Sequence, residues 1–188
     1  MKKALPFFIV AVLCVAAAIR YFRPEVTGMA DASDDEGFTI ADIDQPVPHA
    51  VLPTLDGDWM DMRSYRGKVL LINFWATWCP PCRNEMPELI KLQEEFASQG
   101  FTIVGIAVDD QGDESVKTFA QTKHFRVDGS SASINFPVLL GQNEIMRDMG
   151  FEGELPTSIL VTRDAREVKI IRGPLKAKEL SSVIKGLL

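Results

Sequence analysis

The feature that most constrains the fold is the stretch from residue 68 to residue 96, where an apolar run leads directly into two cysteines and then into a helical pattern. The run "KVLLINFW" is continuous, of strand length and partly β-branched, which is typical of a strand buried on both faces. After Cys79, prolines occupy positions that the first turn of a helix tolerates, and Met86, Leu89 and Ile90 recur at helical spacing. We therefore expect a central strand followed by a helix that starts at the cysteine pair.

The rest of the chain alternates between strand and helix patterns. Residues 50–62 contain two short extended runs around Asp56 and Gly57, a dipeptide suited to a tight hairpin. Further strands are expected at residues 101–108, 136–140, 157–161 and 167–173, and further helices at residues 113–125 and 176–188. This order predicts an α/β fold with a mixed central sheet flanked by helices and an N-terminal β-hairpin extension. The cysteines then lie at the C-terminal end of a central strand, where open sheets carry their chemistry.

Two cysteines separated by two residues, Cys79 and Cys82, allow three interpretations. A purely structural disulfide explains the spacing poorly, because closing so short a loop removes little entropy from the unfolded chain. A structural zinc normally needs four ligands, whereas this motif supplies two. The other candidate ligands are His49, His124 and Cys14, and Cys14 belongs to the N-terminal apolar run. We therefore expect no metal.

Thiol-disulfide exchange is the interpretation that best explains the spacing. It needs a reactive thiolate and a second thiol close enough to expel the mixed disulfide. The positive end of a helix favours the thiolate of Cys79, and Cys82, one turn further on, is expected to be more buried and to act as the resolving thiol. Pro80 and Pro81 stiffen the loop and remove two amide donors. This chemistry needs no cofactor beyond the redox-active Cys79/Cys82 disulfide.

Residues 1–23 have the pattern of a targeting segment. Lys2 and Lys3 precede an uncharged apolar run, and Arg20 and Arg23 close it. The pattern is typical of a signal anchor or a signal peptide, and its length approaches the thickness of a bilayer core. We expect a single N-terminal anchor in the cell membrane with the domain on the periplasmic or extracytoplasmic side, or secretion to the periplasm if the segment is cleaved.

Residues 24–44 are predicted to form an acidic tether. Between residues 24 and 50 the chain carries seven acidic side chains and no lysine or arginine, a composition typical of a solvated linker. The acidic excess behind the formal net charge of −6 belongs mainly to this stretch, because the two signs are nearly balanced from residue 51 onward. Residues 45–188 suffice for one globular domain. Without a basic excess we do not expect a nucleic acid partner.

The segments "FWATWCPPC" and "ELPTSILV" resemble the two signature segments of the thioredoxin superfamily. The wider pattern around them is similar to the membrane-anchored TlpA/ResA-like thiol-disulfide oxidoreductases, over residues 45–188, and weakens in a polar insertion at residues 124–135. The resemblance implies a thioredoxin fold and a protein disulfide reductase that receives electrons from a membrane electron carrier. It implies substrates among exported proteins with CxxC motifs or disulfides, such as apocytochrome c in cytochrome c biogenesis.

The resemblance also implies roles for residues around the cysteines. The proline that matches Pro156 is cis in this family and faces the cysteine pair, and the residue before it, here Leu155, pairs its backbone with the substrate. Trp78 is expected to flank the sulfurs and Trp75 to lie in the core. With Pro80 and Pro81 of the loop, Trp78, Leu155 and Pro156 form the predicted substrate-binding surface.

Two positions bear on proton transfer. Asn73 stands where many thioredoxins carry a buried aspartate, and an amide cannot exchange a proton in the same way. Glu85, one turn after Cys82, matches a glutamate that ResA-like proteins place near the active site, where it could act as the local acid or base. The alternative for Glu85 is a surface carboxylate favoured by the helix dipole. Glu88 is expected to lie on the surface.

Two other functions remain open. A peroxidase of the peroxiredoxin kind shares the fold, but its motif places a threonine three residues before the attacking cysteine, where this chain has Ala76. A copper-delivery module would use Cys79, Cys82 and a histidine, either His49 or His124. Tethered copper chaperones generally space their cysteines one residue wider.

Overall fold

The structure, a computed structural model, describes residues 39–188. The strands are β1 (Thr39–Pro46), β2 (Val51–Pro53), β3 (Trp59–Asp61), β4 (Val69–Trp75), β5 (Phe101–Ala107), β6 (Phe125–Val127), β7 (Ser130–Ala132), β8 (Val138–Leu140), β9 (Thr157–Val161) and β10 (Arg166–Arg172). The α-helices are α2 (Pro80–Phe96), α3 (Asp113–Thr122), α4 (Asn143–Asp148) and α5 (Ala177–Leu187), with short 3-10 helices η1 (Met62–Tyr65) and η2 (Ala97–Gln99). The predicted targeting segment, residues 1–23, lies outside the described residues. Within residues 39–188, no helix is long and apolar enough to cross a membrane.

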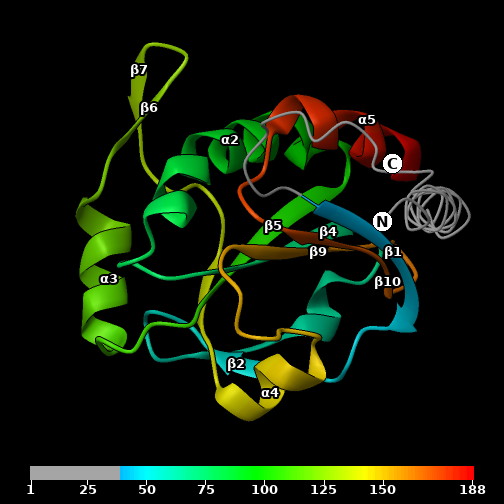
Figure 1. Ribbon diagram of the computed structural model, residues 1–188, viewed down its shortest axis with the longest axis horizontal. Coiled ribbons are helices and arrows are strands. Elements are labelled where there is room, and N and C mark those ends of the chain that lie inside the picture. Colours follow the sequence, from blue (N-terminus) through cyan, green and yellow to red (C-terminus); the bar gives the residue numbers. More distant parts are fainter. Residues whose placement is uncertain (1–38) are drawn as a thin grey trace, which may run out of the picture. The chain divides into compact units, whose positions relative to one another are not determined.

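A six-stranded sheet in the order β1-β10-β9-β4-β5-β8 forms the centre of the domain (Figure 1). β4, β5 and β8 pair in parallel, whereas β9, β10 and β1 join by antiparallel pairing. The predicted mixed sheet flanked by helices is therefore confirmed. The predicted N-terminal hairpin is also present, because β2 and β3 pair antiparallel across a turn in which Gly57 has a φ of 89°.

Strand β4 divides its side chains between the two faces of the sheet. All seven of its residues are buried. Because side chains alternate along a strand, odd-numbered positions such as Leu71 face a core shared with α2, α3 and α5, and even-numbered positions such as Ile72 face a core shared with β2 and α4. Asn73 is an odd-numbered position, so the alternation directs its side chain toward α2.

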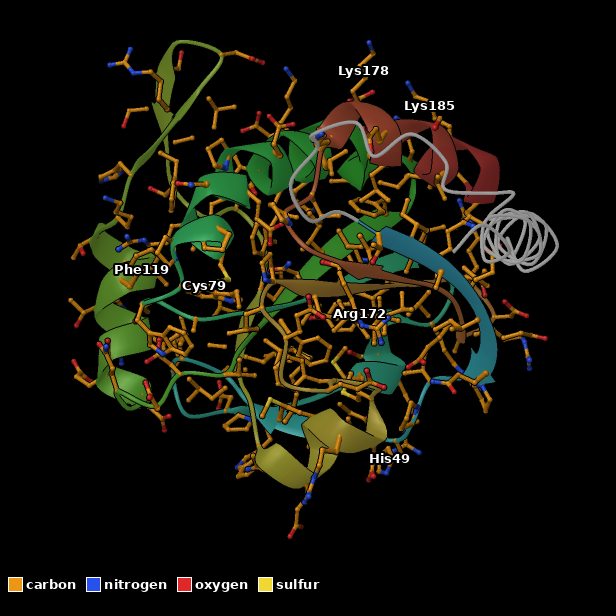
Figure 2. All side chains as sticks on the ribbon, viewed as in Figure 1. His49, Cys79, Phe119, Arg172, Lys178 and Lys185 are labelled. Carbon is orange, nitrogen blue, oxygen red and sulfur yellow. A yellow bond between two sulfur atoms is a disulfide. The ribbon has the colours of Figure 1, made fainter. Side chains whose placement is uncertain are left out.

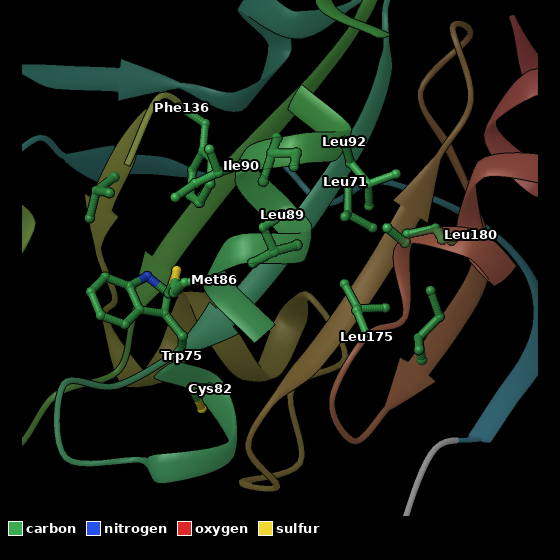
Figure 3. Close-up of a cluster of buried hydrophobic side chains, with 14 of the residues drawn as sticks. Leu71, Trp75, Cys82, Met86, Leu89, Ile90, Leu92, Phe136, Leu175 and Leu180 are labelled. Atoms are coloured by element: carbon green, nitrogen blue, oxygen red, sulfur yellow. The ribbon is translucent and has the colours of Figure 1, made fainter. Parts of the chain in front are cut away.

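The core on the α2 side fixes the helix that carries the cysteines. Trp75 of β4, Met86 and Leu89 of α2, and Leu180 of α5 have no exposed surface, and Figure 3 shows them as parts of one cluster of buried hydrophobic side chains. Burying a side chain of this size contributes about 2 kcal/mol. Trp75 therefore lies in the core, as the resemblance implies. Its ring centroid lies 5.5 Å from that of Phe119 on α3.

The first strand corrects the predicted domain boundary. Composition predicts a tether over residues 24–44 and a domain from residue 45, but β1 pairs with β10 from Thr39 onward. The acidic residues of β1 are partnered across the sheet: Asp42 with Lys169, and Asp44 with Arg166. These partners lie 127 and 122 residues later in the chain, so the local charge balance could not reveal them.

The polar insertion at residues 124–135 forms the hairpin of β6 and β7. Its turn contains Asp128 and Gly129, both with positive φ. Phe125 of β6 is buried in the α2-side core, and Asp128 pairs with Lys91 of α2 at 2.9 Å. The hairpin therefore extends the surface around α2 while its inner strand continues the core.

Gly105 of β5 is a test of how tightly this core is packed. A Cβ added there would lie 3.0 Å from Nε1 of Trp75 and 3.2 Å from the ring of Phe136. We predict that Gly105→Ala lowers the free energy of unfolding by about 1–3 kcal/mol, because neither ring can move freely in a close-packed interior. The measurement is urea unfolding of the oxidised protein.

Gly186→Ala is the matched control for Gly105→Ala. Gly186 lies in the last turn of α5 with nothing within 4 Å of an added Cβ. Alanine has the higher helix propensity, so this variant should be at least as stable as the wild type. Equal stability of the Gly105 variant and the wild type would contradict the packing described for Trp75.

Candidate active site

Cys79 and Cys82 form a disulfide at the start of α2, with an S–S distance of 2.06 Å. Cys79 is the N-cap of the helix, and its sulfur accepts a hydrogen bond from the backbone N of Cys82 at 3.3 Å. Pro80 and Pro81 occupy the first two helical positions, where their missing N–H groups cost least. The helix N-terminus therefore favours negative charge at Cys79, and the amide of Cys82 points at that sulfur.

The two cysteines differ in their access to solvent. Cys79 is 3% exposed and Cys82 has no exposed surface, so a partner can approach the disulfide only at Cys79. Trp78, immediately before it, is 46% exposed. Pro80 is exposed and Pro81 is half-buried. The two residues that flank Cys79 in the chain thus expose an indole and a pyrrolidine ring.

The segment before β9 lies at the same edge of the sheet as the cysteines. The peptide bond between Leu155 and Pro156 is cis, as the resemblance implies. Phe74 pairs with Thr157 in the antiparallel register of β4 and β9, so Pro156 aligns with the last residue of β4. Pro156 is buried and Leu155 is half-buried. The two signature segments of the sequence therefore meet where β4 ends and the loop to Cys79 begins.

Glu85 lies on α2 one turn after Cys82 and is 2% exposed, which rules out the alternative prediction of a surface carboxylate. Its Oε1 accepts a hydrogen bond from Nδ2 of Asn73 at 2.9 Å, and its Oε2 accepts one from the backbone N of Leu175 at 2.6 Å. The same nitrogen of Asn73 donates to Oγ of Ser158 at 2.9 Å. Helix α2, strand β4 and the segment before α5 thus meet at one carboxyl group, and β9 joins the network through Asn73.

The environment of Glu85 gives it an unusual proton affinity. Burial raises the pKa of its carboxyl to about 7, although the hydrogen bonds from Leu175 and Asn73 act in the opposite direction. A carboxyl group with a pKa near neutrality can accept and release a proton at physiological pH. The amide of Asn73 cannot, so Glu85 is the titratable member of this network.

Glu88 is not the simple surface residue that the sequence predicts. It is half-buried, and its Oε2 accepts a hydrogen bond from the backbone N of Ala177 at 3.0 Å. Ala177 is the first residue of α5, and the N–H of a residue at that position has no acceptor within the helix. Glu85 and Glu88, one turn apart on α2, therefore hold the start of α5 and the segment just before it. The backbone groups that they bind lie 90 and 89 residues later in the chain, respectively.

Two side chains of this region, Ser158 and Asp109, were not among the predicted site residues. Ser158 lies opposite Asn73 in the pairing of β4 and β9, and strand pairing alone brings them together. Asp109 follows β5, and its Oδ2 accepts a hydrogen bond from the backbone N of Thr77 at 2.7 Å. The sequence feature that could have indicated Asp109 is a carboxylate two residues after the end of a central strand. Ser158 gave no signal of its own.

The copper hypothesis needs a histidine beside the cysteine pair. Within residues 39–188, His49 lies 3.5 Å from Asp61, and His124 contacts Ser133. Figure 2 shows His49 and Cys79 in separate parts of the domain. This part of the chain holds no group of three or more side chains that could bind a metal ion. The arrangement gives the copper hypothesis no support.

Comparison with known proteins places the chain in a family. Residues 43–170 match the AhpC/TSA family, which covers more than half of the chain and both signature segments. The chain belongs to the AhpC/TSA family.

Individual relatives indicate the activity more narrowly than the family does. The thiol-disulfide oxidoreductase ResA of Bacillus thuringiensis subsp. konkukian is 29% identical over 147 residues, which are 78% of this chain and 79% of the relative. The thioredoxin-like protein YneN of Bacillus subtilis is 31% identical over 137 residues, or 72% of this chain and 75% of the relative. A crystal structure of a thioredoxin-family thiol:disulfide interchange protein from Chlorobium tepidum TLS shares 31% identity with a TM-score of 0.65, covering 84% of this chain and 99% of that one.

These relatives confirm the thioredoxin-like fold and the resemblance to the ResA-like thiol-disulfide oxidoreductases. This AhpC/TSA family member is a thiol-disulfide oxidoreductase of the ResA type, and Cys79 and Cys82 are its cysteine pair.

The raised pKa of Glu85 should make the free energy of unfolding depend on pH. Because its pKa is raised from 4.5 to about 7 on folding, the folded state binds more protons than the unfolded state between these two pH values. The free energy of unfolding should therefore fall by about 3 kcal/mol as the pH rises from 4.5 to 7. Glu85→Gln should lack this fall. The measurement is denaturant unfolding of the oxidised protein across this pH range.

The difference between the wild type and Glu85→Gln isolates the contribution of Glu85 to the pH dependence. Burial also raises the pKa of Glu167, but that group is present in both proteins and cancels in the difference. Glu88→Gln removes a carboxylate from the same helix and leaves Glu85 in place, so the fall due to Glu85 should remain. Parallel pH curves for the wild type and Glu85→Gln would contradict the burial described for this carboxyl.

Proposed function

We propose that this oxidoreductase is an extracytoplasmic reductant that transfers two electrons from the Cys79/Cys82 dithiol to disulfides in exported proteins. One observation carries the proposal: the accessible cysteine caps a helix, and a buried carboxyl with a raised pKa lies one turn beyond the inaccessible one. Nucleophile, resolving thiol and proton acceptor thus follow one another along the first two turns of α2.

In the first step the thiolate of Cys79 attacks one sulfur of the substrate disulfide. A mixed disulfide forms between Cys79 and the substrate, and the other substrate sulfur leaves as a thiolate that takes up a proton. The partial positive charge at the start of α2 and the amide of Cys82 stabilise the Cys79 thiolate before the attack.

In the second step Cys82 attacks the sulfur of Cys79. The S–S bond to the substrate breaks, the second substrate sulfur leaves as a thiolate that takes up a proton, and the Cys79–Cys82 disulfide forms. Cys82 must lose its proton first, and Glu85 is the titratable carboxyl one turn away on the same helix. With a pKa of about 7, the ionised form of Glu85 can accept that proton and pass it to solvent or to the leaving thiolate.

The surroundings of the sulfurs favour a reductant over an oxidant. A strongly oxidising pair has a well-stabilised thiolate in its reduced form. Here Pro80 and Pro81 leave two of the first helical positions without an N–H, and the buried carboxylate of Glu85 opposes a second negative charge at Cys82. Both features make the reduced pair less stable relative to the disulfide.

The cis-proline segment supplies a place for the substrate chain. Leu155 precedes β9 at the edge where β4 leads to Cys79, and its backbone can pair with an extended segment of substrate. Trp78 and Pro80, the neighbours of Cys79 in the chain, offer exposed apolar surface. We assign substrate binding to Trp78, Pro80, Pro81, Leu155 and Pro156.

The location and partners rest on the sequence of residues 1–23 and on the family. A basic, apolar, basic segment of this length supports export of the domain with an N-terminal anchor. In an oxidising compartment the pair must be reduced again after each turnover, so a membrane electron carrier is the proposed source of electrons. Exported CxxC proteins such as apocytochrome c are the proposed substrates.

The reduction potential of the Cys79/Cys82 pair tests the direction of electron flow. Equilibration of the full chain, solubilised in detergent, against defined thiol buffers should give a value near that of thioredoxin, about −270 mV, because Pro80, Pro81 and Glu85 limit the stabilisation that the helix N-terminus gives the reduced form. A value near about −120 mV would contradict a reductant and indicate an oxidant. A chain in which both cysteines are replaced by serine is the control for the redox signal.

Trapping tests the substrate class. Cys82→Ser leaves Cys79 able to attack but removes the resolving thiol, so mixed disulfides with substrates should accumulate in cells. Mass spectrometry of these adducts should identify exported proteins with CxxC motifs or disulfides. Cys79→Ser keeps only the inaccessible thiol and is the matched control. Adducts formed mainly with cytoplasmic proteins would contradict the proposed location.

A further inference from the structure

The loop that carries Cys79 is tied to the end of β5 by one side chain. β4 and β5 pair in parallel up to Trp75 and Ala107 (Figure 1), and the backbone N of Val108 adds one more hydrogen bond, to the carbonyl of Trp75 at 2.8 Å. Beyond this point the pairing of the two strands ends. The carboxylate of Asp109 then bridges them, because its Oδ2 accepts a hydrogen bond from the backbone N of Thr77 at 2.7 Å.

This hydrogen bond acts on the turn that leads to the reactive cysteine. The backbone N of Cys79 donates to the carbonyl of Ala76 at 3.2 Å, which closes a four-residue turn with Thr77 as its second residue. The amide of Thr77 takes no part in that closing bond. Thr77 is 8% exposed, so without Asp109 its N–H would lose its acceptor in a poorly hydrated place.

Asp109 is itself held in place. Its second oxygen, Oδ1, accepts a hydrogen bond from the backbone N of Gln111 at 2.9 Å, which fixes the carboxylate in an Asx-type turn at the end of β5. Both oxygens therefore serve different segments, and each bond joins a carboxylate to an N–H, a stronger type than a bond between neutral groups. A rigid strand end thus sets the position of Thr77.

We propose that Asp109 is a positioning residue for thiol-disulfide exchange, which holds the turn from Ala76 to Cys79 so that the sulfur of Cys79 stays at the N-terminus of α2. Asp109 does not touch the sulfur. Its effect passes through the Thr77 amide and the turn. Small displacements of a reacting atom cost large factors in rate, so the loss of this tie should slow exchange without removing either cysteine.

The test measures the second-order rate constant for reduction of a protein disulfide by the reduced full chain in detergent. Asp109→Ala removes the acceptor for Thr77 and should lower the rate constant about tenfold. Asp109→Asn keeps one carbonyl oxygen for the same amide and should stay within about threefold of the wild type. Asp110→Asn changes the neighbouring exposed carboxylate, for which the described residues give no hydrogen bond to the loop, and is the control for charge alone.

The rescue by asparagine separates positioning from general stability. A residue that only stabilised the fold would change the melting temperature and leave the rate constant of the folded protein unchanged. An Asp109→Ala rate constant within threefold of the wild type, measured well below its melting temperature, would overturn the proposal. So would an Asp109→Asn rate constant as low as that of Asp109→Ala. An inactive wild type would instead count against the enzymatic activity itself.

A measurement on the wild type keeps the proposal testable if Asp109→Ala does not fold. Amide hydrogen exchange followed by NMR should show that the Thr77 N–H is protected in both the oxidised and the reduced protein, since the tie to Asp109 does not involve the sulfurs. Exchange of the Thr77 amide at the rate of an exposed loop would overturn the proposal.

Discussion

The buried carboxyl of Glu85 is the constraint on which the rest of the active site depends. An ionisable group cannot be buried without partners, and those of Glu85 come from β4 and from the segment before α5. Its hydrogen bonds therefore join the helix that carries the cysteines to the centre of the sheet and to the C-terminal helix. The same burial that demands these partners gives Glu85 a pKa of about 7, which is what proton transfer at neutral pH requires.

The alternation of β4 explains why this network can form. Its odd-numbered residues face α2, so Asn73 points at the helix from within an otherwise apolar strand. An aspartate at this position would place two carboxyl groups within hydrogen-bond distance of each other and raise the pKa of at least one of them further. The amide instead donates to Glu85 and Ser158, and the titratable group lies on the helix and not on the strand.

The reactive parts are gathered at one edge of the sheet from segments far apart in the chain. The end of β4 leads to Cys79, the end of β5 carries Asp109, and the start of β9 follows the cis peptide bond at Pro156. The backbone N of Gly173 donates to the carbonyl of Pro156 at 2.9 Å, so the segment that reaches Glu85 through Leu175 is also tied to the substrate side. A rigid sheet edge thus positions loops that have little regular structure of their own.

The sequence by itself determined the central strand and the helix start at the cysteines, because these depend on local periodicity and on proline and glycine chemistry. That the two signature segments meet followed from the resemblance to the thioredoxin superfamily. The sequence could not place β1 in the sheet, because the charges that balance Asp42 and Asp44 lie on β10. Nor could it decide between a surface and a buried Glu85, since helical spacing puts a residue on a face but does not say what covers that face. Tertiary structure decided this by packing β4 and α5 against α2, and it brought Asp109 to the Thr77 amide by parallel pairing of β4 with β5. Hydrogen bonds to buried polar groups depend on which segments the core brings together, and that is a property of the whole chain.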